Sequence, residues 1–161
     1  MGNYLLIDTS SSKAQIALAD ENKIIVQKIW DSYHDLSDKL LPNIEKLLLS
    51  CHSGDKRRPE SDSGQAGMTV NDLSGIIVYL GPGTFTGLRI GITVANAFVY
   101  SFSIPIVGVK GKSFGKEKFE IKNLKPIDLN ELLKKGLREI REKKKSKFAV
   151  PFYGKKPNIG R

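Results

Sequence analysis

The chain has 161 residues, enough for one domain with its own hydrophobic core, and a formal net charge of +9. Its single cysteine excludes a disulfide-stapled scaffold and indicates a reducing compartment, so the expected location is the cytoplasm. Asp8 interrupts the first apolar run too early for a signal peptide. The longest apolar stretch, 88–109, contains Arg89 and Asn96 and is a poor membrane span, so we expect no membrane attachment.

The positive charge is concentrated in the last third of the sequence. Residues 1–109 hold nine Lys and Arg against eleven Asp and Glu, whereas residues 110–161 hold seventeen against six, giving −2 and +11. This shift predicts a main unit, 1–109, followed by a basic extension, 110–161. Basic extensions often meet nucleic acid or another acidic surface, and a solvated, lysine-rich surface explains the composition equally well.

The first half of the chain predicts strands followed by a helix. Apolar runs at 4–7, 14–19 and 23–30, separated by polar turns, predict an antiparallel meander of three strands. Ser32 resembles the start of a capping box, and the leucine spacing after it predicts a helix to about residue 49. Residues 50–68 are rich in Ser, Gly and charge, which predicts a mobile surface loop.

A glycine-rich stretch, Gly81–Gly91, follows the apolar run 76–80 and leads into a helix that ends near Phe102. Strand, glycine-rich turn and helix bring backbone N–H groups together at a helix N-terminus, which suits an anion or a close backbone contact. No lysine follows Gly87 as in a P-loop, and the spacing does not match G-x-G-x-x-G. A tight turn with glycine at an unusual backbone angle is the alternative.

The helix after this turn is apolar on two sides, which predicts burial on two sides. One stripe contains Leu88, Ile92, Ala95, Val99 and Phe102, and the other contains Ile90, Val94, Ala97 and Phe98. The sheet can cover one side. We expect a partner protein to cover the other, with the alternative that the first helix and the C-terminal part cover it within one chain. A short strand is expected before Val109.

The basic extension predicts a strand near 119–121 and then a helix from Asp128 to about Lys145. Its end alternates aromatic and basic residues from Phe148 onward. Such an end could stack on RNA bases and neutralise phosphates, or it could form an apolar strap along the fold.

The sequence shows no combination of base, nucleophile and metal ligands. Cys51 and His52 are adjacent but lie in the polar stretch 50–68, and His34 has no second histidine at metal-binding spacing. We therefore expect neither a catalytic residue nor a metal site.

Several stretches together resemble the TsaB (YeaZ) family. They are Leu6–Ser10, His34, Leu40–Pro42, Gly81–Gly91 and Ile104–Val109, of which Gly81–Gly91 is the most specific. The resemblance covers residues 4–49 and 70–109. The ends Pro151–Tyr153 and Pro157–Ile159 are similar to that family's C-terminal strap more weakly.

The resemblance implies an α/β fold of the actin/Hsp70 (ribonuclease H-like) type, with a mixed sheet and helices. It also implies a non-catalytic dimerisation and scaffold subunit for the catalytic subunit TsaD, joined by the ATPase TsaE, in the machinery that makes threonylcarbamoyladenosine in tRNA. Helices 33–49 and 87–102 would pair with a partner's helices, in a heterodimer or a homodimer. The expected interface residues are Leu36, Leu40, Ile44, Leu48, Leu88, Arg89, Ile92, Ala95 and Val99.

The chain differs from that family after Val109, where the family carries a second actin-like lobe and this sequence has the basic extension. Nucleotides in this fold bind between two lobes, so we expect no resident cofactor, and ATP or ADP could bind only at a partner interface. The residues that could touch a phosphate there are Asp8, Thr9, Gly81, Gly83 and Thr84. The metal-binding histidines of the catalytic paralogue are absent.

Two other functions stay open. The basic tail could make the chain a tRNA-binding accessory module, a role that can coexist with a scaffold. Alternatively, the chain could be a weak ATPase of the actin-like superfamily or a remnant peptidase, with Asp8, Thr9 and Thr84 as its polar groups.

Overall fold

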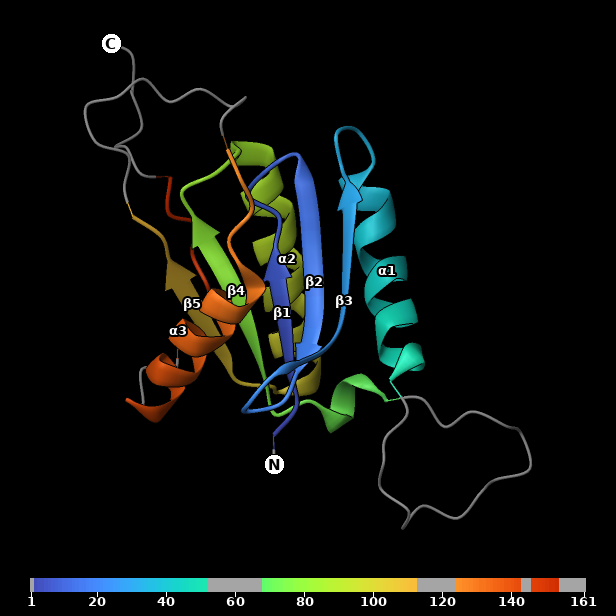
Figure 1. Ribbon diagram of the computed structural model, residues 1–161, viewed down its shortest axis with the longest axis vertical. Helices are drawn as coiled ribbons and strands as arrows, with labels where there is room; N and C mark the ends of the chain where they lie inside the picture. Colours follow the sequence, from blue (N-terminus) through green and yellow to red (C-terminus); the bar gives the residue numbers. More distant parts are fainter. Residues whose placement is uncertain (1, 52–67, 113–123, 143–145, 154–161) are drawn as a thin grey trace.

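The computed structural model describes residues 2–51, 68–112, 124–142 and 146–153, and shows a mixed β-sheet with helices on both faces (Figure 1). The strands are β1 (Tyr4–Asp8), β2 (Lys13–Ala19), β3 (Ile24–Asp31), β4 (Gly75–Gly81) and β5 (Ile106–Lys110). Their order across the sheet is β3-β2-β1-β4-β5. The expected α/β class with a mixed sheet is confirmed.

The pairing of the strands explains their sequence patterns. β1, β2 and β3 form the predicted antiparallel meander, while β1, β4 and β5 run parallel to one another. Every residue of β1 and β4 is buried, because both strands have neighbours on each side and helices over each face. β3 lies at the edge of the sheet, and burial alternates along it residue by residue.

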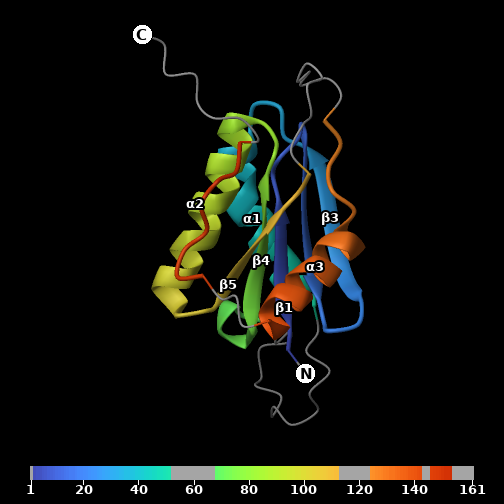
Figure 2. The same ribbon diagram turned by 90° about the vertical axis from the view of Figure 1, so that its left-hand side faces the viewer.

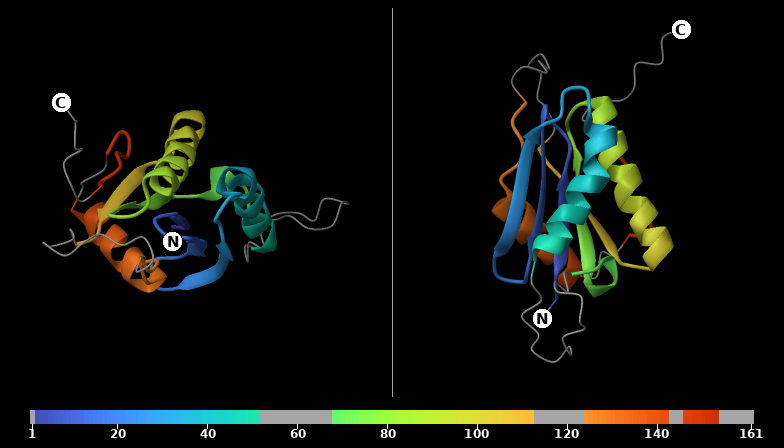
Figure 3. Two further views of the ribbon diagram at one scale, coloured as in Figure 1. Left: turned by 90° about the horizontal axis from the view of Figure 1, so that it is seen from above. Right: turned by 90° about the vertical axis from the view of Figure 1, so that its right-hand side faces the viewer.

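Two helices cover one face of the sheet and a third covers the other (Figures 2 and 3). The first face carries α1 (Leu36–Ser50) and α2 (Phe85–Phe102), and a short 3₁₀ helix, η1 (Val70–Asp72), precedes β4. The second carries α3 (Leu129–Arg141). A hydrophobic core lies on each face of the sheet, and successive residues of β1 point into opposite cores. Leu5 and Ile7 pack with α1 and α2, and Leu6 packs with α3.

The prediction that Ser32 begins a capping box is wrong. The amide and the hydroxyl of Ser32 both donate to Ser12 O, at 2.8 and 3.0 Å, so Ser32 joins the end of β3 to the β1–β2 turn instead of capping a helix. α1 begins at Leu36, with Asp35 in the N-cap position and no side-chain cap. Pro42 lies inside α1, as predicted.

Asp128 caps α3, as the sequence predicts. Its carboxylate accepts from the amides of Asn130 and Glu131 at 2.8 and 3.0 Å. The predicted strand at 119–121 lies outside the described residues. So do most of the loop 50–68, residues 143–145 of the expected helix, and residues 154–161.

We expect Asp128→Ala to lower the free energy of unfolding by about 1 kcal/mol, because two amides at the start of α3 lose their acceptor. Urea unfolding measures the change. Asp128→Ser keeps a side-chain acceptor and should lose only a few tenths of a kcal/mol. Equal losses in both variants would show that the cap does not stabilise α3.

Candidate functional site

The carboxyl ends of β1 and β4 meet at a contact between two loops. The turn after β1 lies directly on the glycine-rich stretch that opens α2. Thr84 N donates to Ser10 O at 2.7 Å, and Thr9 Oγ1 donates to Gly87 O at 2.6 Å. The glycine-rich stretch and the turn therefore bind each other through main-chain groups and the Thr9 hydroxyl.

Three glycines of the stretch 81–91, one before α2 and two in its first turns, are required by this close approach. A Cβ atom on Gly87 would lie 2.2 Å from Thr9 O, and one on Gly91 would lie 2.1 Å from Thr9 Oγ1. A Cβ atom on Gly83 would lie 2.5 Å from Ser10 O. Gly81 meets a different requirement, since its φ is +114°. The sequence left an anion site and a close backbone contact as interpretations of this stretch. The close backbone contact accounts for these glycines without a ligand.

Asp8 is fully buried on the α3 side of the same sheet end. Its Oδ1 accepts from Ser10 N at 2.9 Å, and its Oδ2 accepts from Gln15 Nε2 at 2.9 Å and from Ile127 N at 3.0 Å. The Gln15 amide also donates to Ile127 O. Burial raises the pKa of the Asp8 carboxyl, and these hydrogen bonds act in the opposite direction. Asp8 therefore anchors the segment that leads into α3.

Four of the five residues predicted to touch a phosphate, Asp8, Thr9, Gly81 and Gly83, are buried, and Thr84 alone is partly exposed. A phosphate would have to displace Ile127 to reach the Asp8 carboxylate. Phosphate contact by this set stays a prediction.

A pocket with many hydroxyl residues, which sequence reasoning missed, lies on the other face, where the β1–β2 turn faces the first turns of α1 and α2. It has a volume of about 400 Å³. Its lining contains the hydroxyl residues Ser11, Ser12, Ser32, Tyr33, Ser37, Thr84 and Thr86, together with His34, Leu36, Gly87 and Ile90. The serine run at 10–12 was the available signal, but its relation to the start of α1 depends on the β1–β2 turn.

The expected interface residues are mostly in the core of the chain itself. The buried ones are Leu36, Leu40, Ile44 and Leu48 in α1, and Leu88, Ile92 and Ala95 in α2. Arg89 is exposed and Val99 is partly buried. The surface of the same helix pair is formed by their neighbours.

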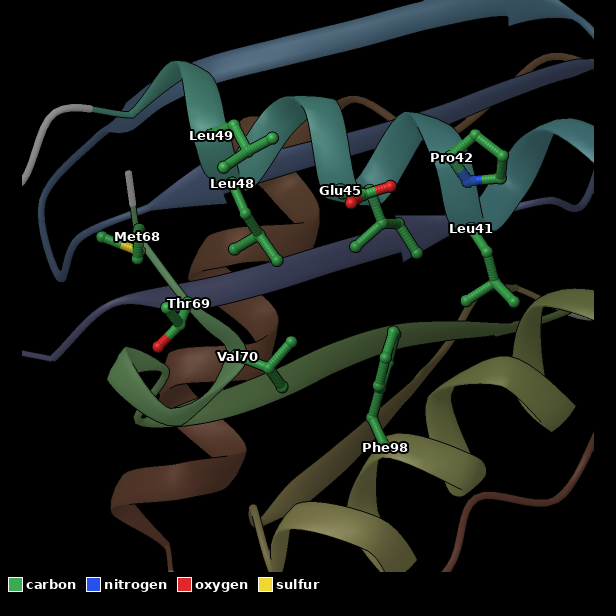
Figure 4. Close-up of a pocket in the computed structure, with 10 residues that line it drawn as sticks. Leu41, Pro42, Glu45, Leu48, Leu49, Met68, Thr69, Val70 and Phe98 are labelled. Carbon is green, nitrogen blue, oxygen red and sulfur yellow. The ribbon is translucent and has the colours of Figure 1, made fainter. Parts of the chain in front are cut away.

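Those neighbours, together with Ile44 and Leu48 of the expected set, line an apolar groove of about 450 Å³ between α1, η1 and α2 (Figure 4). Leu41 from α1 and Phe98 from α2 point into it from opposite sides. Leu41 is 51% exposed and Leu49 is 56% exposed. The complete lining is Leu41, Pro42, Ile44, Glu45, Leu48, Leu49, Met68, Thr69, Val70 and Phe98.

Residues 146–153, which we call the strap, run along the side of α2 that faces away from α1 (Figures 2 and 3). Asn96 exchanges two hydrogen bonds with the main chain of Ala149, at 2.9 and 2.8 Å. The Phe85 and Tyr153 rings stack at 4.9 Å. Both sides of α2 thus have neighbours within the chain, as the alternative reading held, and its two apolar sides do not by themselves require a partner.

Within the described ranges, no three His, Cys, Asp or Glu side chains come together as a metal site would need. None of the helices in those ranges is long and apolar enough to cross a membrane.

Known proteins resemble this chain in sequence and in structure. A tRNA threonylcarbamoyladenosine biosynthesis protein TsaB from Bacillus subtilis (strain 168) is 35% identical over 65% of this chain and 39% of its own. The TsaB protein of Buchnera aphidicola is 31% identical over 71% of this chain and 47% of its own. The solved structure of YeaZ from Pseudomonas aeruginosa superimposes with a TM-score of 0.55 at 25% identity, over 68% of this chain and 44% of that one. Over about two thirds of its length, the chain is therefore similar to the TsaB (YeaZ) family.

The similarity to TsaB proteins covers only part of those proteins. The chain spans less than half the length of the curated relatives and of the YeaZ structure it matches. A family model described as TsaD, tRNA N6-adenosine threonylcarbamoyltransferase, matches residues 63–111, which include β4, α2 and β5. The mixed sheet and its helices agree with the actin-like fold expected of TsaB relatives.

The packing of Thr9 against Gly91 predicts that the effect of Gly91→Ala on the free energy of unfolding depends on the side chain at position 9. Gly91→Ala should destabilise the protein by about 1–2 kcal/mol, because overpacking against Thr9 Oγ1 exceeds the gain in helix propensity of about 1 kcal/mol. In a Thr9→Ala background the same change should be close to neutral or stabilising, because Oγ1 and Cγ2 are gone and only Cβ of residue 9 remains, at 3.1 Å. Urea unfolding of the four proteins tests this. Equal destabilisation in both backgrounds would contradict the proposed contact.

The raised pKa of Asp8 predicts how stability depends on pH. A carboxyl whose pKa is raised by folding stabilises the fold below its unfolded pKa of about 3.9, and this stabilisation is lost as pH rises through the folded pKa. Relative to Asp8→Asn, the wild-type protein should therefore lose stability as pH rises from about 4. Urea unfolding of both proteins over this range measures the difference. A wild-type advantage that grows with pH would show that the hydrogen bonds outweigh burial.

Proposed function

We propose that this chain acts in tRNA threonylcarbamoyladenosine biosynthesis as a non-catalytic subunit that binds a TsaD-type partner. The names of the TsaB relatives support the pathway, and the TsaD family match over 63–111 supports a shared architecture with the partner. In this proposal the chain holds no cofactor of its own. ATP or ADP would bind at a subunit interface, where an ATPase of the TsaE type would join the complex.

The observation that carries the proposal is the apolar groove between α1 and α2. Protein interfaces depend on a few apolar anchors that fill pockets at their centre, with a polar rim around them. Leu41 and Leu49 are half-exposed aliphatic side chains on the rim of the groove, and Glu45 lies between them along α1. A helix of the partner could place its apolar residues over Phe98 and Val70, in the way that amphipathic helices occupy hydrophobic grooves.

The expected interface residues take a different role in this arrangement. Leu40, Ile44 and Leu48 hold α1 on the sheet, and Ile44 and Leu48 also line the groove, while Leu41 and Leu49 meet the partner. A second copy of the chain could use the same groove, so a homodimer and a complex with TsaD would compete for it.

We expect Leu41→Asp to weaken binding of the TsaD-type subunit at least about tenfold, because the complex would bury an unpaired carboxylate. Light scattering after size exclusion and titration calorimetry, with TsaD from the same organism, measure the effect. Ile25→Asp is the matched control, since Ile25 is 43% exposed on β3 and lies outside the groove.

Three outcomes separate the alternatives. A mixed peak at the sum of the masses that Leu41→Asp abolishes supports the proposal. A wild-type monomer that ignores TsaD at micromolar concentration overturns it. A wild-type dimer that Leu41→Asp converts to a monomer, without any complex with TsaD, assigns the groove to a second copy of this chain.

A further inference from the structure

The side of α2 that carries the strap presents exposed aromatic rings. Phe85 is 57% exposed, Phe148 is 46% exposed and Tyr100 is 83% exposed. Tyr100 lies one helical turn beyond Asn96, the residue that binds Ala149 of the strap, so it projects on the same side of the helix. The strap and this side of α2 form one continuous surface, which we call the α2–strap surface.

Cations sit on the rings of this surface. Arg89 lies over the Phe85 ring at 5.0 Å, Lys110 over Phe152 at 5.3 Å, and Lys147 over Phe148 at 5.9 Å. Phe85 in turn stacks on Tyr153. Every cation–ring pair found among the described residues lies on the strap or beside it. Such pairs hold a guanidinium or ammonium group next to a flat apolar face.

The elements of this surface contain no carboxylate of their own. The sequence has no Asp or Glu between Asp72 and Glu117, and none after Glu142, so α2, β5 and the strap lack acidic residues altogether. α3 is different, because Lys135 pairs with Glu131 and Arg138 with Glu142. The basic residues of α3 are thus largely balanced within the helix, whereas Arg89 and Lys147 have rings as their neighbours.

We propose that the α2–strap surface binds single-stranded RNA. Unpaired bases can stack on exposed aromatic rings without sequence preference, and nearby cations neutralise the phosphates between them. Duplex bases are stacked on one another and cannot reach such rings. A second protein or an anionic membrane are the competing ligands. The proposal does not rest on the groove between α1 and α2, which lies on the opposite side of α2.

The test is fluorescence anisotropy of a labelled oligouridylate of about 12 nucleotides with the full chain, from about 50 to about 200 mM salt. Each phosphate contact to a single strand contributes about 0.7 to the slope of log affinity against log salt. Arg89→Gln and Lys147→Gln should each lower the slope by about that amount. Lys134→Gln removes the same charge from the exposed side of α3 and should leave the slope unchanged.

The stacking component is tested separately with ring removals. Tyr100→Ala and Phe148→Ala should each weaken binding about fivefold or more while leaving the salt slope unchanged. Both rings are exposed, and unfolding of each variant in urea shows whether the fold is intact. Leu41→Asp should bind the oligonucleotide like wild type, so failure of the groove proposal and failure of this one are distinguishable.

Each remaining outcome overturns the proposal. The proposal fails if the wild-type protein does not bind the oligonucleotide at micromolar concentration, or if it binds duplex RNA with equal affinity. It also fails if Lys134→Gln and Lys147→Gln change the salt slope equally. Binding to anionic phosphatidylserine vesicles but not to the oligonucleotide would assign the surface to membrane instead.

Discussion

The rest of this structure depends on the contact between the turn after β1 and the first turns of α2. Thr9 lies against Gly91 and bonds to Gly87, and Ser10 binds the amide of Thr84. These contacts fix α2 against the centre of the sheet, at the end where β1 and β4 both stop. Because α2 forms a wall of the groove on one side and supports the strap on the other, its position determines both surfaces.

On the opposite face, one buried carboxylate joins the two parts of the sequence. Asp8 and Gln15 bind the main chain of Ile127, which leads into α3. The strap adds two further attachments, since Phe152 N donates to Leu80 O at 2.7 Å and Ala149 exchanges hydrogen bonds with Asn96. Over its described residues, the basic extension is thus part of the packing around the sheet.

The sequence predicted what local patterns determine and missed what long-range contacts determine. The strands, the Asp128 cap and the helix with an internal Pro42 follow from periodicity and from side chains that act on their own neighbourhood. The Ser32 prediction was wrong because its hydroxyl found a partner twenty residues earlier, at Ser12. The leucine stripe of α1 was correctly identified as apolar, but periodicity alone cannot tell a face on the sheet from a face toward a partner. The groove depends on Phe98 and Val70, which no pattern within α1 could indicate.

The hydrogen bond between Asp8 and Ile127 limits when the parts of this protein can pack together during synthesis. The two residues are separated by 119 positions. At about 5–20 residues per second, a ribosome takes about 6–24 s to add that stretch. During this interval the Asp8 carboxylate remains without one of its donors, and one face of β1 lacks the helix that covers it. A nascent chain of this protein therefore exposes one apolar face of its central strands until α3 has emerged, and that face is available to a chaperone during this period.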